Sequence, residues 1–201
     1  MKKIKELLDH IFIDGLSGMA QGLFATLIIG TIIQQIGTLI GGPRGDMIFA
    51  IGKVAAALTG AGIGVGVAAK FKESYLVVVS AATAGMVGAF ASKLLAGTVL
   101  VDGTMVFAGP GEPLGAFLAA YIGIECGHLV ASKTKVDILV TPIVTIGTGS
   151  LTGLLVGPGV SKIMTSLGAM INWGVEQQPF LMGIVVSVLM GMILTLPISS
   201  A

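Results

Sequence analysis

The chain has 201 residues, of which 54% are hydrophobic and only 10% are charged, and its mean hydropathy is +1.01. A soluble domain carries about 25% charged residues, so this composition argues against a water-facing surface of the size the chain would need. The formal net charge of +1 provides no basic field, which argues against nucleic acid as a partner. The composition predicts an all-α integral membrane protein.

Six stretches are long and apolar enough to cross a bilayer as helices, which takes about 20 residues each. They cover residues 15–40, 47–69, 75–97, 113–131, 138–156 and 180–200. Seven lysines precede the first span or lie in the loops after the second and fourth: Lys2, Lys3, Lys5, Lys70, Lys72, Lys133 and Lys135. The opposite loops hold only Arg44 and Lys162. Since basic residues gather in cytoplasmic loops, the pattern predicts a cytoplasmic N-terminus.

Two connecting segments have patterns of their own. Residues 98–107 contain two β-rich runs around Asp102-Gly103, which predicts an outer β-hairpin. The glycines and prolines of residues 109–113 cannot continue as ordinary helix, so the region 98–113 is expected to end in a re-entrant turn. Residues 161–176 have apolar side chains at helical spacing among polar ones, which predicts an amphipathic helix at the outer interface. A short seventh span is the alternative for that segment.

Glycine is unusually frequent, with 31 residues. Gly60, Gly62, Gly64 and Gly66 fall in one apolar stretch. Small side chains let membrane helices approach closely. We therefore expect this stretch to pack tightly against its neighbours.

The sequence Gly109-Pro110-Gly111-Glu112-Pro113 holds the most informative carboxylate. Irregular backbone at membrane depth survives only where it is buried in protein or lines a cavity. Glu112, with Gly111 and Pro113 beside it, could then accept hydrogen bonds from sugar hydroxyls. The alternative is an ordinary glutamate in a solvated outer loop.

Four other ionisable residues fall within predicted spans, where a charge costs about 2.5–3.5 kcal/mol at the centre. Lys93 lies close to the outer end of its span, so we expect its amine to extend to the interface. Lys53 either pairs with Glu112 at a similar depth or extends its amine to the interface. Glu125 and His128 are three residues apart and share a helix face. They form a proton-linked pair, line the solute path, or form a satisfied polar patch near the inner interface.

Several kinds of chemistry leave no signature in the sequence. There is no glycine-rich phosphate-binding loop, no nucleophile elbow and no cysteine–histidine cluster. The single Cys126 cannot form an internal disulfide. We therefore expect no cofactor, no metal ion and no enzyme activity from this chain alone.

Three stretches together resemble the bacterial phosphotransferase-system EIIC-like family, which includes proteins described as perfringolysin regulators. They are residues 13–23 (IDGLSGMAQGL), 109–115 (GPGEPLG) and 196–201 (LPISSA). The resemblance covers essentially the whole chain and implies one EIIC-like transmembrane domain over residues 1–201. Members of the family continue beyond the LPISSA stretch, so the resemblance also implies the N-terminal part of a longer protein.

The resemblance implies a bacterial inner-membrane permease that binds a sugar at mid-membrane. An EIIB partner, with EIIA, would supply phosphoryl transfer in trans, and the permease would be a homodimer. Other EIIC branches carry a Gly-Ile-Thr-Glu-Pro motif whose glutamate binds sugar. The corresponding residues 110–113 keep Glu-Pro but lack Ile-Thr. Two alternatives stay open: an EIIC-fold membrane sensor without phosphotransfer, and a transporter of another small solute or ion.

Overall fold

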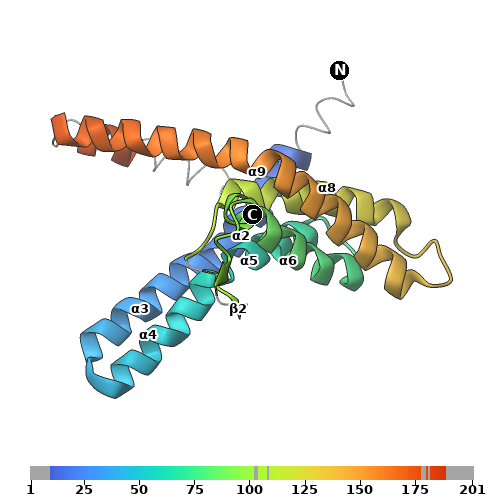
Figure 1. The fold of residues 1–201 in the computed structure, drawn as a ribbon, viewed down its shortest axis with the longest axis horizontal. Helices are drawn as coiled ribbons and strands as arrows, with labels where there is room; N and C mark the ends of the chain where they lie inside the picture. The colour runs from blue at the N-terminus through green and yellow to red at the C-terminus, as the bar shows by residue number, and fades with distance from the viewer. Residues whose placement is uncertain (1–9, 102–103, 108, 178–179, 181, 189–201) are drawn as a thin grey trace.

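The computed structural model describes residues 10–101, 104–107, 109–177, 180 and 182–188, and it is almost entirely helical (Figure 1). The first helical run extends over 31 residues, His10–Ile40. It contains two π-helical segments and two α-helices: η1 (His10–Gly15), α2 (Leu16–Leu23), η2 (Phe24–Ile28) and α3 (Ile29–Ile40). The run begins five residues before the predicted first span and ends at the same residue.

The predicted second span is two helices, α4 (Gly42–Ala57) and α5 (Thr59–Lys70), bent by 52°. Leu58 leaves the helical conformation at the bend, and the buried Thr59 Oγ1 donates a hydrogen bond of 2.6 Å to the Ala56 carbonyl. A hydroxyl that bonds to nearby backbone competes with the regular helical pattern. The predicted span over 47–69 is therefore a bent pair of helices and not one regular helix.

The predicted third span is also broken. Helix α6 (Tyr75–Ala89) ends before Phe90, and a short helix α7 (Ala91–Leu95) follows. Strands β1 (Leu100–Val101) and β2 (Thr104–Met105) then pair antiparallel, with Leu100 opposite Met105. The predicted strand pairing is present, with two residues a strand instead of four. Its turn at 102–103 lies outside the described residues.

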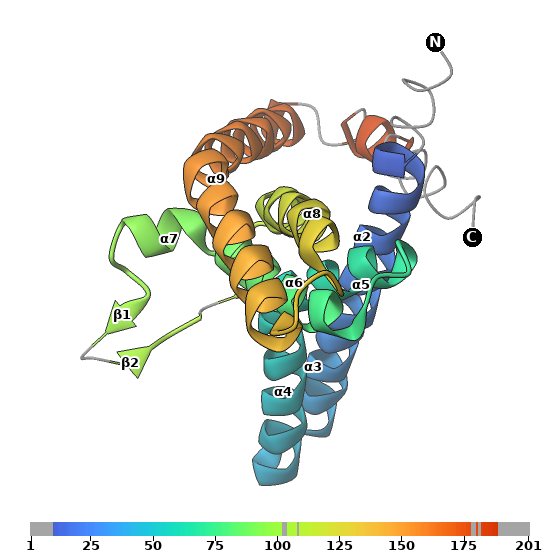
Figure 2. The same cartoon turned by 90° about the vertical axis from the view of Figure 1, so that its right-hand side faces the viewer.

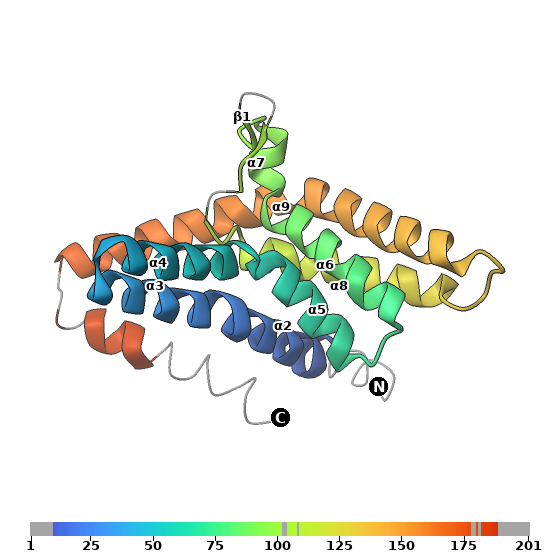
Figure 3. The same ribbon diagram turned by 90° about the horizontal axis from the view of Figure 1, so that it is seen from below.

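The second half of the described chain consists mainly of two helices. Helix α8 (Pro113–Val130) agrees with the predicted span 113–131, whereas α9 (Asp137–Gln177) is one helix of 41 residues that contains Pro142 and Pro158. The sequence predicted a span that ends at residue 156, and a proline inside a helix removes a backbone donor. The helix instead continues through Pro158, and its axis changes direction near the middle of α9 (Figures 1 and 3). The separate amphipathic helix predicted at 161–176 is the continuation of α9.

Among the described residues, three helices are long and apolar enough to cross a membrane: His10–Ile40, Pro113–Val130 and Asp137–Ala169. The bent pair α4–α5 would make a fourth. Helix α6 is apolar but has only 15 residues. The protein is thus an all-α membrane protein, but the predicted six spans are not confirmed. Most of the last predicted span, and the three N-terminal lysines behind the predicted orientation, lie outside the described residues.

Glycines form the contacts between neighbouring helices, as the sequence predicted. A Cβ on Gly62 or Gly66 would meet the first helical run, at the backbone of α2 or the Thr26 side chain of η2, whereas a Cβ on Gly60 or Gly64 would meet α6. Alternate glycines of α5 therefore face two different helices. The space beside them is filled by a buried cluster that includes Ile63 on α5.

The helices form a central bundle, from which the helical hairpin α3–α4 projects. Helix α8 is flanked by α5, α6 and α9, and α2 packs on α5 (Figure 2). Helices α3 and α4 lie side by side and extend beyond this bundle (Figure 3). Helix α7 and β1 project from another side of the molecule, and in Figure 3 they lie between the helical hairpin α3–α4 and α6. The turn at 109–113 connects that projection to α8 and so lies where bundle, hairpin and projection meet.

Candidate functional site

The turn 109–113 is held against the end of α6. The Glu112 backbone N–H donates a hydrogen bond of 2.8 Å to the Ala89 carbonyl, the last of α6. Gly111 has a φ of +73°, and a Cβ there would lie 2.7 Å from the Ala89 Cβ. Only glycine fits this combination of conformation and close approach. The break at Phe90 and the turn thus depend on each other.

Glu112 is the N-cap of α8, and Pro113 is its first residue. The Glu112 Oε1 accepts a hydrogen bond of 3.4 Å from the Leu114 backbone N–H. Proline suits this position because its missing N–H has no partner there. The single long bond leaves most of the carboxylate's acceptor capacity available to a ligand.

A cleft of about 590 Å³ lies on one side of the turn. Its walls are formed by Leu27, Thr31 and Gln34 of the first helical run, by four residues of α4 including Lys53, and by loop residues up to Pro110. This volume is within the range of about 300–1,000 Å³ that is usual for small-molecule sites. The structure therefore places the predicted site residue Lys53 on the wall of a cleft.

A second cleft of about 240 Å³ lies on the other side of the turn. It is lined by the ends of α6 and α7, by residues 110–112 and by Gly157 and Ser161 of α9. Pro110 lines both clefts, so the turn is the wall between them. Of the predicted site residues, Gly111 and Glu112 face this second cleft.

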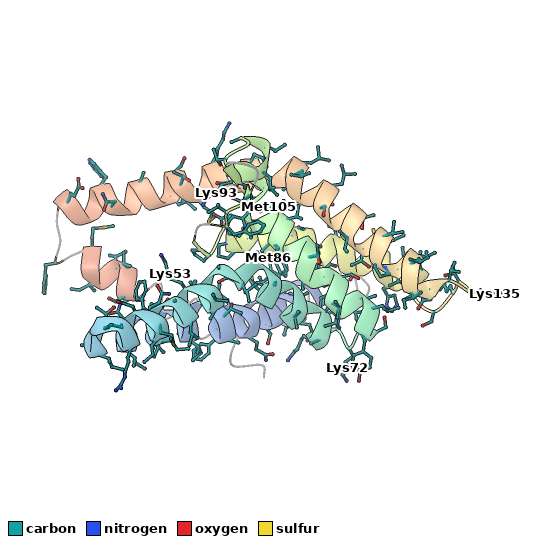
Figure 4. The ribbon with its side chains drawn as sticks, turned by 60° about the horizontal axis from the view of Figure 1, so that its bottom comes forward. Lys53, Lys72, Met86, Lys93, Met105 and Lys135 are labelled. Carbon is teal, nitrogen blue, oxygen red and sulfur yellow. The ribbon has the colours of Figure 1, made fainter. Side chains whose placement is uncertain are left out.

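Lys93 also lines the second cleft, and its ammonium lies 5.4 Å from the centre of the Phe90 ring. The sequence predicted instead that its amine extends to the interface, because a continuous helix over 75–97 would place it at a membrane end. Lys53 lies 5.7 Å from the Phe49 ring and makes no ion pair with Glu112, although the structure describes both residues. Figure 4 shows Lys53 on α4, apart from Lys93 near Met105.

Glu125 and His128 each bond to a different partner at the far end of α8. The His10 Nε2 lies 3.2 Å from the Glu125 Oε1, and the His128 Nδ1 lies 2.9 Å from the Glu73 Oε1. The His10 ring also stacks on Phe71, with ring centres 4.0 Å apart. Neither Glu125 nor His128 lines the two clefts. The hydrogen bonds favour the satisfied polar patch over the proton-linked pair.

We expect His128→Gln to lower the free energy of unfolding by less than about 1 kcal/mol, because partly exposed ion pairs contribute little. The His128 side chain is 67% exposed. Chemical unfolding in detergent measures the change. Solute affinity should stay as in the wild type, and a large loss of affinity would instead return His128 to the solute path.

Among the described residues, no group of three or more histidine, cysteine, aspartate or glutamate side chains could hold a metal ion. The absence of a metal or cofactor stays a prediction.

Comparison with known proteins agrees with the architecture. The family model described as "Phosphotransferase system, EIIC" matches residues 13–201. Neither a curated protein nor a solved structure matches the chain. The match covers both clefts, the turn between them and all the described helices except the first residues of η1. The chain therefore belongs to the phosphotransferase system EIIC family.

Proposed function

We propose that this protein is the membrane permease of a phosphoenolpyruvate-dependent sugar phosphotransferase system, and that it binds its sugar beside the turn 109–113. The family assignment supports a permease-type role in general terms. The observation that carries the site is the position of Glu112, on irregular backbone between two clefts, with its N–H bonded to the end of α6.

The chemistry of the turn suits a polyhydroxyl ligand. Transporters commonly bind solute at broken helices, where backbone and side chains line a cavity. A carboxylate such as Glu112 accepts two hydroxyl donors at once, and a charged acceptor makes stronger hydrogen bonds than a neutral one. Gly111 and Pro113 fix the carboxylate at the start of α8. Lys53 adds a cation on the other side of Pro110.

The wider assignment follows from the family. Residues 1–201 would form one EIIC-like unit in the bacterial inner membrane, with several spans and a cytoplasmic N-terminus. Phosphoryl transfer would take place on an EIIB partner supplied with EIIA in trans, and the permease would act as a homodimer. Glu125 and His128 would lie toward the cytoplasmic end, as a polar patch or as part of the exit path.

The test is thermal unfolding of the purified protein in detergent with a panel of sugars, polyols and organic acids. A ligand at 100 times its dissociation constant should stabilise the folded state by about 2.7 kcal/mol. We expect one sugar to raise the midpoint in the wild type and to have little effect on Glu112→Gln. Glu176→Gln is the matched control, because Glu176 is exposed on α9 and bonds to Asn172.

Two other outcomes contradict separate parts of the proposal. Stabilisation by no sugar would contradict the permease assignment and favour the sensor or the ion transporter. If a sugar stabilises Glu112→Gln as much as the wild type, the proposed role of Glu112 in the site is contradicted, and the permease assignment still stands.

A further inference from the structure

The larger cleft contains a cation, Lys53, for which the proposed function names no partner. Among the described residues lining this cleft, Lys53 is the only one with a charged side chain. The rest of the lining is apolar except for Thr31 and Gln34. The carboxylate of Glu112 belongs to the other cleft.

Lys53 lies well inside the bent pair α4–α5, which would cross the membrane as one broken span, and its amine cannot reach either end of that pair. It follows the start of α4 at Gly42 by eleven residues and precedes the end of α5 at Lys70 by seventeen. At 1.5 Å per residue, the shorter distance is about 16 Å. A lysine side chain has only four methylene groups, so it cannot extend over that distance. A charge at this depth is costly unless it has a partner.

The surroundings of Lys53 offer little compensation. Its ammonium lies 5.7 Å from the Phe49 ring, which provides only a weak cation–π interaction. No salt bridge involves Lys53 in the part of the chain that the structure describes. Thr31 donates its hydroxyl to the Leu27 carbonyl, and the Gln34 amide donates to the Gly30 carbonyl. The remaining oxygens of these two side chains could accept hydrogen bonds from sugar hydroxyls.

We infer that the solute carries a carboxylate, as a sugar acid does, and that Lys53 binds this group. The inference rests on the proposed function and names the substrate class within it. A lysine is a compact point charge that pairs well with one carboxylate. A phosphate group carries a charge of about −1.5 to −2 and more acceptor oxygens than a carboxylate, whereas the described lining of this cleft offers one lysine and no second cation. Thr31 and Gln34 in the same cleft leave acceptors for the hydroxyls.

The experiment compares matched solutes on the purified full chain in detergent, by thermal unfolding and equilibrium binding. D-glucose, D-galactose and D-mannose are each paired with the corresponding hexuronate, and D-glucose 6-phosphate serves as the phosphate probe. We expect a hexuronate to bind the wild type more tightly than its hexose. In Lys53→Gln, the affinity for the hexuronate should fall by about tenfold to a hundredfold, the range of a charge-assisted bond.

Two further variants separate charge from folding. Lys53→Arg keeps the charge and should retain most of the hexuronate affinity. Lys162→Gln removes a charge from an exposed position on α9 and should leave the affinity unchanged. If Lys53→Gln does not fold, the comparison of hexose and hexuronate on the wild type still decides whether the solute carries a carboxylate.

The other outcomes are distinct. If the wild type binds the neutral hexose or glucose 6-phosphate more tightly than the hexuronate, the inference of a carboxylate on the solute is overturned, and the permease assignment still stands. Unchanged hexuronate affinity in Lys53→Gln overturns the role of Lys53. A wild type that binds no sugar, neutral or acidic, overturns the proposed function itself.

Discussion

Gly64→Ala is expected to lower the free energy of unfolding by about 3 kcal/mol, the upper part of the usual range for overpacking a core. A Cβ on Gly64 would overlap the Ala81 carbonyl of α6, with the carbonyl carbon 2.6 Å away. The atoms it meets are backbone, which cannot rotate aside as a side chain can. Helices α5 and α6 would have to separate, which would open the buried cluster around Ile63 and Val77. Chemical unfolding in detergent, followed by circular dichroism, measures the loss.

Gly147→Ala provides the matched control on α9. A Cβ there would have no atom within 4 Å. Alanine is favoured over glycine in a helix by about 1 kcal/mol, so this variant should be as stable as the wild type or more so. Equal stability of the two alanine variants would show that α5 and α6 are not packed as closely as described.

Gly111→Ala is expected to reduce solute affinity by at least about tenfold, which corresponds to 1.4 kcal/mol. Its φ of +73° is unfavourable for alanine, and its Cβ would lie 2.7–2.8 Å from the Cβ and carbonyl oxygen of Ala89. The turn would move away from α6, which would lengthen the bond from the Glu112 N–H to the Ala89 carbonyl. The Glu112 carboxylate would then leave its position beside the second cleft.

Gly97→Ala separates the two causes of that effect. Gly97, which follows α7, also has a positive φ, +70°, but a Cβ there would have no neighbour within 4 Å, and it lines neither cleft. It should therefore show only the cost of the left-handed conformation, about 1–2 kcal/mol of stability, and retain solute binding. Binding of the solute at the turn is contradicted if Gly111→Ala binds as tightly as Gly97→Ala.

Three features could be predicted from the sequence: the membrane class, the helix 113–131 and the packing role of the α5 glycines. Each of them depends on local composition or spacing. The breaks at Leu58 and Phe90 were missed because the residues around them are as apolar as the helices they separate. At the second break, the Ala89 carbonyl accepts a hydrogen bond from the backbone N–H of Glu112, which is more than twenty residues away. Such a partner cannot be read from a local window.

The candidate site could be predicted only where it depends on local sequence, and not where it depends on distant partners. The glycines and prolines around Glu112 identify the turn directly, whereas Lys93 reaches the second cleft only because α6 ends early. Glu125 and His128 share a helix face as expected, but their partners His10 and Glu73 come from distant segments. Spacing within one helix could not distinguish a shared site from two separate ion pairs.

The central claim is that solute binds at the turn between the two clefts, and thiol labelling tests it most directly. In a Cys126→Ser background, which removes the native cysteine, Pro110→Cys places a thiol on the wall of both clefts. Val136→Cys, at an exposed position in the turn before α9, is the control. The rate of reaction with a maleimide is measured with and without the sugar or sugar acid that stabilises the wild type. We predict that the solute slows labelling at position 110 severalfold and leaves position 136 unchanged. An unchanged rate at position 110 under saturating solute would contradict the account.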